Sequence, residues 1–247
     1  MRFMSILFSG DFHANEINEL SYISRETLVG KYSREEYSGI AWHVILGDGG
    51  FLWPHKQKTD EANFMALSKR PFPVLCIVGN HEPILGRNDI PEVDLGLGET
   101  VYQIHDKPLV AYLKRGKVYT IGGFKFLVLG GALSIDKGWR KPSVSWWAKE
   151  YWSEEEKEDL FALLEKEHDF DYVLAHTGPN TVNVELFGDI MPGSPKFKDE
   201  VAILNDEIDS RINCRGWWCG HWHKDRYFYD EDRQRGYQYL YKGTNIL

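Results

Sequence analysis

The chain has 247 residues, of which 43% are hydrophobic and 27% are charged, and its formal net charge is −8. This length can bury one sizeable core, and 23 Gly and 10 Pro are close to average usage, which excludes collagen-like and low-complexity proteins. The acidic balance argues against a protein that coats a nucleic-acid backbone, because no basic excess is available to neutralise phosphates. It does not exclude an enzyme that handles phosphate esters at one local site.

Three cysteines, Cys76, Cys214 and Cys219, are too few for a disulfide framework and indicate a reduced, cytoplasmic compartment. The apolar run from Phe3 to Phe8 is interrupted by a serine and is too short for a signal peptide. No stretch approaches the ~18 apolar residues of a membrane span. With no linker, repeat or composition break, we expect residues 1–247 to form a single domain. The oligomeric state stays open.

Short apolar runs, rich in β-branched and aromatic residues, alternate along the chain with helical patterns. The runs predict buried strands within residues 4–10, 43–48, 73–80, 125–131, 171–177 and 216–221. The helical patterns cover residues 15–30, 60–69, 153–168 and 195–212. The third helix opens with a capping box at Ser153, and Pro195 suits the first turn of the fourth.

Two stretches each contain consecutive predicted strands with no helix between those strands. Residues 100–129 hold three such segments, and Gly122-Gly123 predicts a two-residue hairpin turn between the last two. Residues 226–243 repeat the pattern around a charged turn. The expected fold class is therefore α/β of mixed type, in which two mixed β-sheets form a sandwich flanked by helices.

Polar side chains follow the predicted strands at the points where the strands end. They are Asp11 and His13, then Asp48, then Asn80, His81 and Glu82, then His176, and finally His221 and His223. Because ligands of α/β sheets bind at the carboxyl ends of strands, these side chains are expected to meet in one place. Oxygen and imidazole ligands suit Zn, Mn or Fe(II), and the absence of cysteine argues against a purely structural zinc. Any one of these histidines alone would be better explained as a hydrogen-bonded core or turn residue.

The set resembles the calcineurin-like metallophosphoesterase superfamily. The blocks Asp-x-His, Gly-Asp, Gly-Asn-His-Glu, a later His and Gly-His-x-His all occur here in order, across residues 11–223. The resemblance implies a four-layer αββα sandwich with two divalent metal ions between the sheets. It implies that Asp11, His13 and His223 hold one ion, that Asn80, His176 and His221 hold the other, and that Asp48 bridges them.

The resemblance also implies a reaction, namely hydrolysis of a phosphate ester by a hydroxide that bridges the two metals. His81 would lie beside the metals as a general acid or as a stabiliser of the transition state. The ligand types do not decide between Mn, Fe and Zn, and monoester and diester substrates both remain open.

One departure from the family pattern bears on the substrate. Protein-phosphatase members extend the second block to Gly-Asp-x-x-Asp-Arg-Gly, whereas residues 47–53 here read GDGGFLW. The missing Asp and Arg favour a small-molecule or nucleotide-type ester over a phosphoprotein. Which group orients His81 is left open.

Two residues are candidates for substrate binding. Arg140 follows a predicted strand and could replace the missing phosphate-binding cation, as could Lys137, although either one could instead be a solvated loop charge. Trp222 stands between two predicted ligands and could line the site. The dense tryptophans Trp139, Trp146, Trp147 and Trp152 suit either packing under a loop or stacking on a flat leaving group.

Two alternative functions remain. Some members of the superfamily keep the fold but lose catalysis and serve as protein-binding scaffolds, and loss of ligands marks them. Here all seven ligand positions and His81 are present. The other alternative is a nuclease subunit of a larger assembly. Against it, the chain is acidic and no basic nucleic-acid-binding surface is evident.

Overall fold

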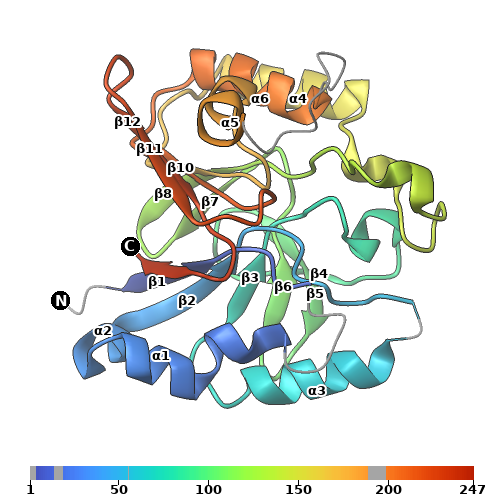
Figure 1. Ribbon diagram of the computed structural model, residues 1–247, viewed down its shortest axis with the longest axis vertical. Helices are drawn as coiled ribbons and strands as arrows, with labels where there is room; N and C mark the ends of the chain where they lie inside the picture. Colours follow the sequence, from blue (N-terminus) through green and yellow to red (C-terminus); the bar gives the residue numbers. More distant parts are fainter. Residues whose placement is uncertain (1–3, 14–18, 55, 189–198) are drawn as a thin grey trace.

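The computed structural model describes residues 4–13, 19–54, 56–188 and 199–247 and arranges them in four layers (Figure 1). Helices α1 to α3 cover one sheet, helices α4 to α6 cover the other, and the two sheets pack face to face. The expected sandwich of two mixed sheets flanked by helices is confirmed. No helix among the described residues is long and apolar enough to cross a bilayer.

The first sheet has the strand order β13-β1-β2-β3-β6-β5-β4. Strands β1, β2, β3 and β6 run parallel, and the outer strands pair antiparallel. Strand bounds are β1 Ser5–Ser9, β2 Ile40–Ile45, β3 Val74–Cys76, β4 Glu92–Asp94, β5 Thr100–His105, β6 Val110–Tyr112 and β13 Thr244–Ile246. The last strand, β13, lies beside the first, β1 (Figure 1).

The second sheet has the order β11-β12-β10-β9-β8-β7, with β12, β10, β9 and β8 parallel. Strand bounds are β7 Lys117–Ile121, β8 Phe124–Val128, β9 Tyr172–Leu174, β10 Gly216–Cys219, β11 Arg226–Asp230 and β12 Arg235–Tyr239. The hairpin at Gly122-Gly123 is confirmed, because Ile121 pairs with Phe124 across it. Six strands were expected from the apolar runs, and each run overlaps one, although β2 and β8 begin before their runs.

The helices begin where side chains cap them. Ser33 and Ser153 each accept a hydrogen bond from a glutamate N–H three residues on and complete a capping box, and Asp199 caps α6. Helix bounds are α1 Arg25–Lys31, α2 Arg34–Gly39, α3 Gln57–Leu67, α4 Glu154–Leu164, α5 Asn180–Phe187 and α6 Glu200–Arg211. Short 3₁₀ turns are η1 Glu19–Ile23, η2 Pro83–Gly86, η3 Lys137–Trp139 and η4 Ala148–Glu150.

Several helix expectations need correction. The predicted helix 15–30 is a 3₁₀ turn and a short α-helix separated at Ser24, which caps the second piece, and its first four residues lie outside the described residues. The predicted helix 153–168 ends at Leu164. The predicted helix 195–212 begins at Glu200, and Pro195 lies outside the described residues. Helices α2 and α5 were not expected.

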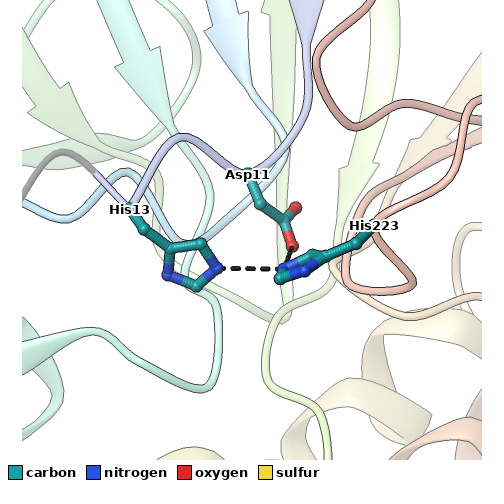
Figure 2. A group of neighbouring side chains, drawn as sticks. All are labelled: Asp11, His13 and His223. Atoms are coloured by element: carbon teal, nitrogen blue, oxygen red, sulfur yellow. Dashed lines mark hydrogen bonds and ion pairs between the residues drawn. The ribbon is translucent and has the colours of Figure 1, made fainter. Parts of the chain in front are cut away.

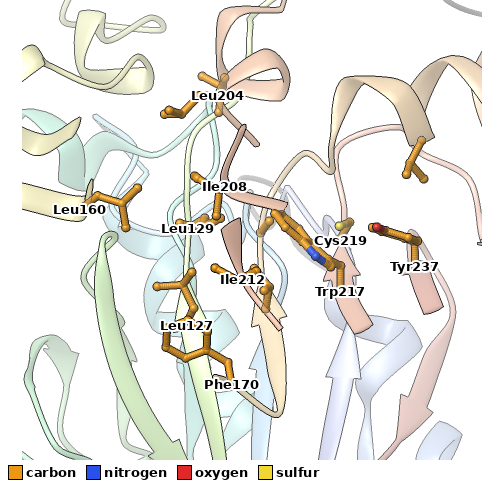
Figure 3. Packing of buried hydrophobic residues seen from close by; sticks show 14 of the residues in the cluster. Leu127, Leu129, Leu160, Phe170, Leu204, Ile208, Ile212, Trp217, Cys219 and Tyr237 are labelled. Carbon is orange, nitrogen blue, oxygen red and sulfur yellow. The ribbon is translucent and has the colours of Figure 1, made fainter. Parts of the chain in front are cut away.

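Side-chain alternation along the strands builds three apolar layers. Phe8 of β1 faces the second sheet and stacks on Trp218 of β10, with ring centroids 4.2 Å apart, whereas its neighbour Leu7 faces the outer helices. Trp217 likewise faces outward, toward α4 to α6. Figure 3 shows this outer cluster, in which Ile208 of α6 and Leu160 of α4 lie over the second sheet. Burying each such side chain contributes about 1.5–3 kcal/mol.

Candidate metal centre

The five predicted polar blocks lie at the carboxyl ends of five strands. Asp11 and His13 follow β1, Asp48 follows β2, and Asn80 and His81 follow β3 of the first sheet. His176 follows β9, and His221 and His223 follow β10 of the second sheet. The two sheets bring these ends together at a cavity of about 470 Å³ whose walls include residues from every block except the His176 block. His176 lies beneath it, fully buried.

Asp11, His13 and His223 form one group of side chains, and their ligand atoms lie within 4.8 Å of one another. Figure 2 shows the two imidazoles with their Nε2 atoms directed at each other, 3.0 Å apart. Nε2 of His223 lies 3.3 Å from an oxygen of Asp11. Asp11 is buried, whereas the side chains of His13 and His223 are 28% and 48% exposed and line the cavity.

Asp11, Asp48 and His176 form a second, fully buried group within the same limit of 4.8 Å. The Nδ1 atom of His176 donates to the carbonyl of Leu46 at 2.8 Å, which leaves Nε2 facing the cluster. That Nε2 lies 2.9 Å from Oδ1 of Asn80 and 3.5 Å from Oδ2 of Asp48.

Asp48 belongs to the second group and also approaches the first. His81 N–H donates to its Oδ1 at 2.8 Å, which fixes the carboxylate. Its other oxygen, Oδ2, lies 3.5 Å from Nε2 of His176 and 3.7 Å from Nε2 of His13. One carboxylate oxygen therefore reaches both groups.

His221 joins the cluster through its backbone and its ring. Its N–H donates to Asp11 at 3.0 Å, and its ring centroid lies 5.1 Å from that of His176. Burial and the neighbouring His176 lower the pKa of His221 to about 3, so its imidazole is neutral, as a metal ligand must be.

The spacing and charge of these side chains fit divalent cations. Atoms about 2.1 Å from one metal and at right angles to each other lie about 3 Å apart. The 2.9 Å between Asn80 Oδ1 and His176 Nε2 and the 3.0 Å between the Nε2 atoms of His13 and His223 match this separation.

The raised pKa of His176 also indicates a site that attracts a cation. Burial alone would lower the pKa of His176, but Asp48 and Asp11 outweigh burial and raise it to about 10. The two buried carboxylates thus attract positive charge to the point where the ligand atoms converge. A cation there would take the place of that proton.

The backbone at the cluster is strained. Seven non-glycine residues of the described chain have positive φ, and four of them are His13, Asp48, His221 and His223. Such conformations cost of order 1–3 kcal/mol each and concentrate at functional sites.

Glycine permits the close approach of these loops. A Cβ on Gly79 would lie 2.1 Å from Oδ1 of Asp48, and one on Gly47 would lie 2.1 Å from Nδ1 of His176. Only glycine fits at either position.

His81 and Arg140 face one part of the cavity beside the two groups. Nε2 of His81 lies 3.8 Å from Oδ2 of Asp48 and 3.3 Å from Nη2 of Arg140. Arg140 is held by Asp136, whose Oδ1 lies 2.6 Å from its Nε, and by the carbonyl of Ser145. Burial lowers the pKa of His81, against the opposing effect of Asp48.

The sequence matches the family model described as calcineurin-like phosphoesterase over residues 4–225. The chain belongs to the calcineurin-like phosphoesterase family. Membership implies metal-dependent hydrolysis of phosphate esters, and the candidate ligands Asp11, His13, Asp48 and His176 lie together as such a site requires.

Solved structures share the fold at low sequence identity. One crystal structure has a TM-score of 0.54 and 10% identity, with 95% of this chain and 89% of that chain covered. The phosphopantetheinyl hydrolase of Mycobacterium tuberculosis has a TM-score of 0.51 and 12% identity, with 98% and 92% covered. A comparison with curated protein sequences finds no match.

Glu82, the last residue of the family block Gly-Asn-His-Glu, holds the loop that follows Asp48 through hydrogen bonds. Its carboxylate accepts hydrogen bonds from Gly49 N–H at 2.7 Å and from the Tyr112 hydroxyl at 2.5 Å. Burial and the nearby Asp48 raise the pKa of Glu82 to about 8. Because Gly49 follows Asp48, Glu82 positions the loop that carries the central carboxylate.

Ser134 and Glu150, which the sequence did not reveal, orient Asn80. The Asn80 amide nitrogen donates to the Ser134 hydroxyl at 2.9 Å, and that hydroxyl donates to the buried Glu150 at 2.5 Å. The nitrogen of the amide is thereby turned away, and its oxygen faces His176. Neither residue belongs to a recognisable motif.

The other predicted residues are also located. Trp222 lines the cavity, and its ring stacks on Phe187 at 5.1 Å. Lys137 instead lies over the ring of Trp146, so its charge is not directed at the cavity. Trp147 and Trp152 are buried in packing, whereas Trp139 is 94% exposed. Trp53 and Ile135 complete the apolar walls, and the sequence analysis did not single them out.

Proposed function

We propose that this chain hydrolyses a phosphate ester at a two-metal centre. Asp11, His13 and His223 would hold one ion, Asn80, His176 and His221 the other, and Asp48 both. The observation that carries the proposal is the position of Asp48 Oδ2, within 3.7 Å of a histidine Nε2 from each group. When bound, two divalent cations supply neutralisation of the phosphoryl charge and activation of water.

The protein's own residues would hold the phosphoryl group beside the metals. His81 and Arg140 point at one region of the cavity wall, 3.3 Å apart, where each can donate to a phosphoryl oxygen. Asp136 and the Ser145 carbonyl fix the guanidinium in advance, so little conformational entropy is lost when it binds. His81 would act as an acid toward the leaving oxygen or as a stabiliser of the transition state.

The cavity supports a small-molecule or nucleotide-type ester. Its volume of about 470 Å³ exceeds the space that a phosphate group needs and lies within the range of drug-sized ligand sites. Trp53, Trp222 and Ile135 offer apolar surface to a leaving group. Arg140 supplies, from a different loop, the cation that the protein-phosphatase block would otherwise contribute.

The test is hydrolysis of p-nitrophenyl phosphate and bis-p-nitrophenyl phosphate by metal-stripped protein resupplied with Mn(II). We expect turnover that requires metal, with the preferred ester identifying a monoesterase or a diesterase. Turnover of neither ester by protein that holds metal would overturn the proposal in favour of a binding scaffold.

A further inference from the structure

A second cavity, of about 290 Å³, shares no wall residue with the metal-centre cavity, and five lysine or arginine residues line it. Its walls include Arg87, Lys114, Arg115, Lys117 and Lys149, in a chain whose net charge is −8. Two acidic residues, Glu156 and Asp159, also line it. The lining therefore carries a net positive charge although the protein as a whole is acidic. We refer to this cavity as the basic pocket.

Three of the five cations are already neutralised by ion pairs. Arg115 bonds Glu156 at 2.7 Å, Arg87 bonds Asp89 at 2.5 Å, and Lys114 bonds Glu92 at 2.5 Å. Lys117 and Lys149 form no ion pair with any described residue, and they come from different elements, the start of β7 and the η4 turn. These two ammonium groups are the ones available to an anionic ligand.

A third cavity, of about 450 Å³, shares a wall residue with the metal-centre cavity and another with the basic pocket. Trp53 forms a wall of both this middle cavity and the metal-centre cavity. Arg87 forms a wall of both the middle cavity and the basic pocket. Between them the middle cavity is bounded by Trp147 and Pro83, with the Trp53 and Trp147 rings 5.4 Å apart and nearly perpendicular. The middle cavity, whose walls include two tryptophans, thus shares walls with a cavity that contains Arg140 and with the basic pocket.

We infer that the substrate is a phosphodiester whose leaving group carries a second phosphate, and that this second phosphate binds at Lys117 and Lys149. The inference rests on the proposed function, because it places the scissile phosphate at Arg140 and the metal centre. A flat or apolar segment between the two phosphates would lie against Trp53 and Trp147, since ring faces and edges favour such contacts. A short oligonucleotide has this alternation of anionic and flat groups.

The test compares oligothymidylates of two to ten nucleotides with bis-p-nitrophenyl phosphate, which has no second phosphate. For the unaltered protein with Mn(II), we expect KM to fall about tenfold as the chain becomes long enough to reach the basic pocket, because two charge-assisted contacts are added. The double variant Lys117→Ala/Lys149→Ala should lose this gain and still hydrolyse bis-p-nitrophenyl phosphate normally. Lys166→Ala, an exposed lysine elsewhere, is the matched control.

Binding measured without turnover separates this inference from the proposed function. Fluorescence anisotropy of end-labelled decathymidylate with metal-free protein should show binding that the double variant weakens about tenfold and Lys166→Ala leaves unchanged. If the protein binds decathymidylate through these lysines but hydrolyses neither ester, the basic pocket is a phosphate-binding site and the two-metal proposal is wrong. A KM independent of oligonucleotide length, or a gain that survives in the double variant, would overturn the inference.

Discussion

The amide nitrogen of Asn80 donates to the Ser134 hydroxyl at 2.9 Å, and this bond determines which side of the amide faces His176. Ser134 can accept that bond because its own proton goes to the buried Glu150. The carbonyl oxygen of Asn80 is therefore held in the orientation that a metal ligand needs. Outer hydrogen bonds of this kind tune metal affinity.

Replacing the serine should weaken metal binding without removing a ligand. For Ser134→Ala we expect the Mn(II) dissociation constant of the ion that Asn80 would hold to rise about 10–100-fold, because the amide loses its fixed orientation. Isothermal titration of metal-stripped protein measures this constant. Ser210→Ala, an exposed serine on α6, is the control. An unchanged affinity in Ser134→Ala would show that Asn80 is oriented by something else.

Removing the cation beside His81 should impair catalysis more than metal binding. For Arg140→Ala we expect kcat/KM for a phosphate ester to fall about 10–1000-fold, because the guanidinium is aimed at the place where phosphoryl charge develops. Arg140→Lys should recover only part of this loss, since lysine lacks the planar fork. Metal content should stay the same in both variants. Steady-state kinetics measures the effect, and Lys141→Ala, at an exposed neighbouring residue, is the control. An unaltered kcat/KM in Arg140→Ala would exclude Arg140 from substrate binding.

Asp60 should make stability fall as pH rises. It is 8% exposed, one oxygen accepts from Leu52 N–H, and burial raises the pKa of its carboxyl from 3.8 to about 6. Because the folded state binds this proton more tightly than the unfolded state does, the protonated carboxyl stabilises the folded protein below the unfolded pKa. This stabilisation is lost as the pH rises from about 4 to about 6. At pH 7 the ionised group costs on the order of 3 kcal/mol.

The variant Asp60→Asn removes this titration. Its unfolding free energy relative to the unaltered protein should increase from pH 4 to pH 7, as measured by urea unfolding at several pH values. Glu61→Gln, an exposed neighbour on the same helix, should show no such trend. A constant difference between Asp60→Asn and the unaltered protein across this range would contradict the raised pKa.

The sequence predicted the buried strands, the polar cluster at their ends and the glycines of the close loops. Apolar runs located β1, β2, β3, β8, β9 and β10, because buried parallel strands are almost continuously hydrophobic. The polar residues after them marked the cluster, since the carboxyl ends of parallel strands share an edge. Glycines such as Gly79 accompanied the ligands because the loops approach too closely for a Cβ.

Helix α5, the contact between Ser134 and Glu150 and the orientation of Arg140 depend on tertiary packing, which the sequence patterns do not show. Helix α5 contains two Val, one Thr and two Asn within Asn180–Phe187, which are weak helix formers, and the buried side chains Val182 and Phe187 stabilise it through packing. Ser134 and Glu150 are sixteen residues apart in a segment without periodicity, so nothing in the chain indicated that they meet below Asn80. The direction of Arg140 likewise depends on Asp136 and on the Ser145 carbonyl.

The central claim is that one cluster binds two metals and that His81 acts beside them without binding either. Metal content and turnover of bis-p-nitrophenyl phosphate, measured together on the unaltered protein, Asp48→Asn and His81→Ala, test it most directly. We predict two Mn(II) per chain in the unaltered protein and in His81→Ala, with turnover at least about 100-fold lower in the latter. Asp48→Asn should lose both metal and turnover. A chain that binds fewer than two ions, or His81→Ala protein with full turnover, would contradict the claim.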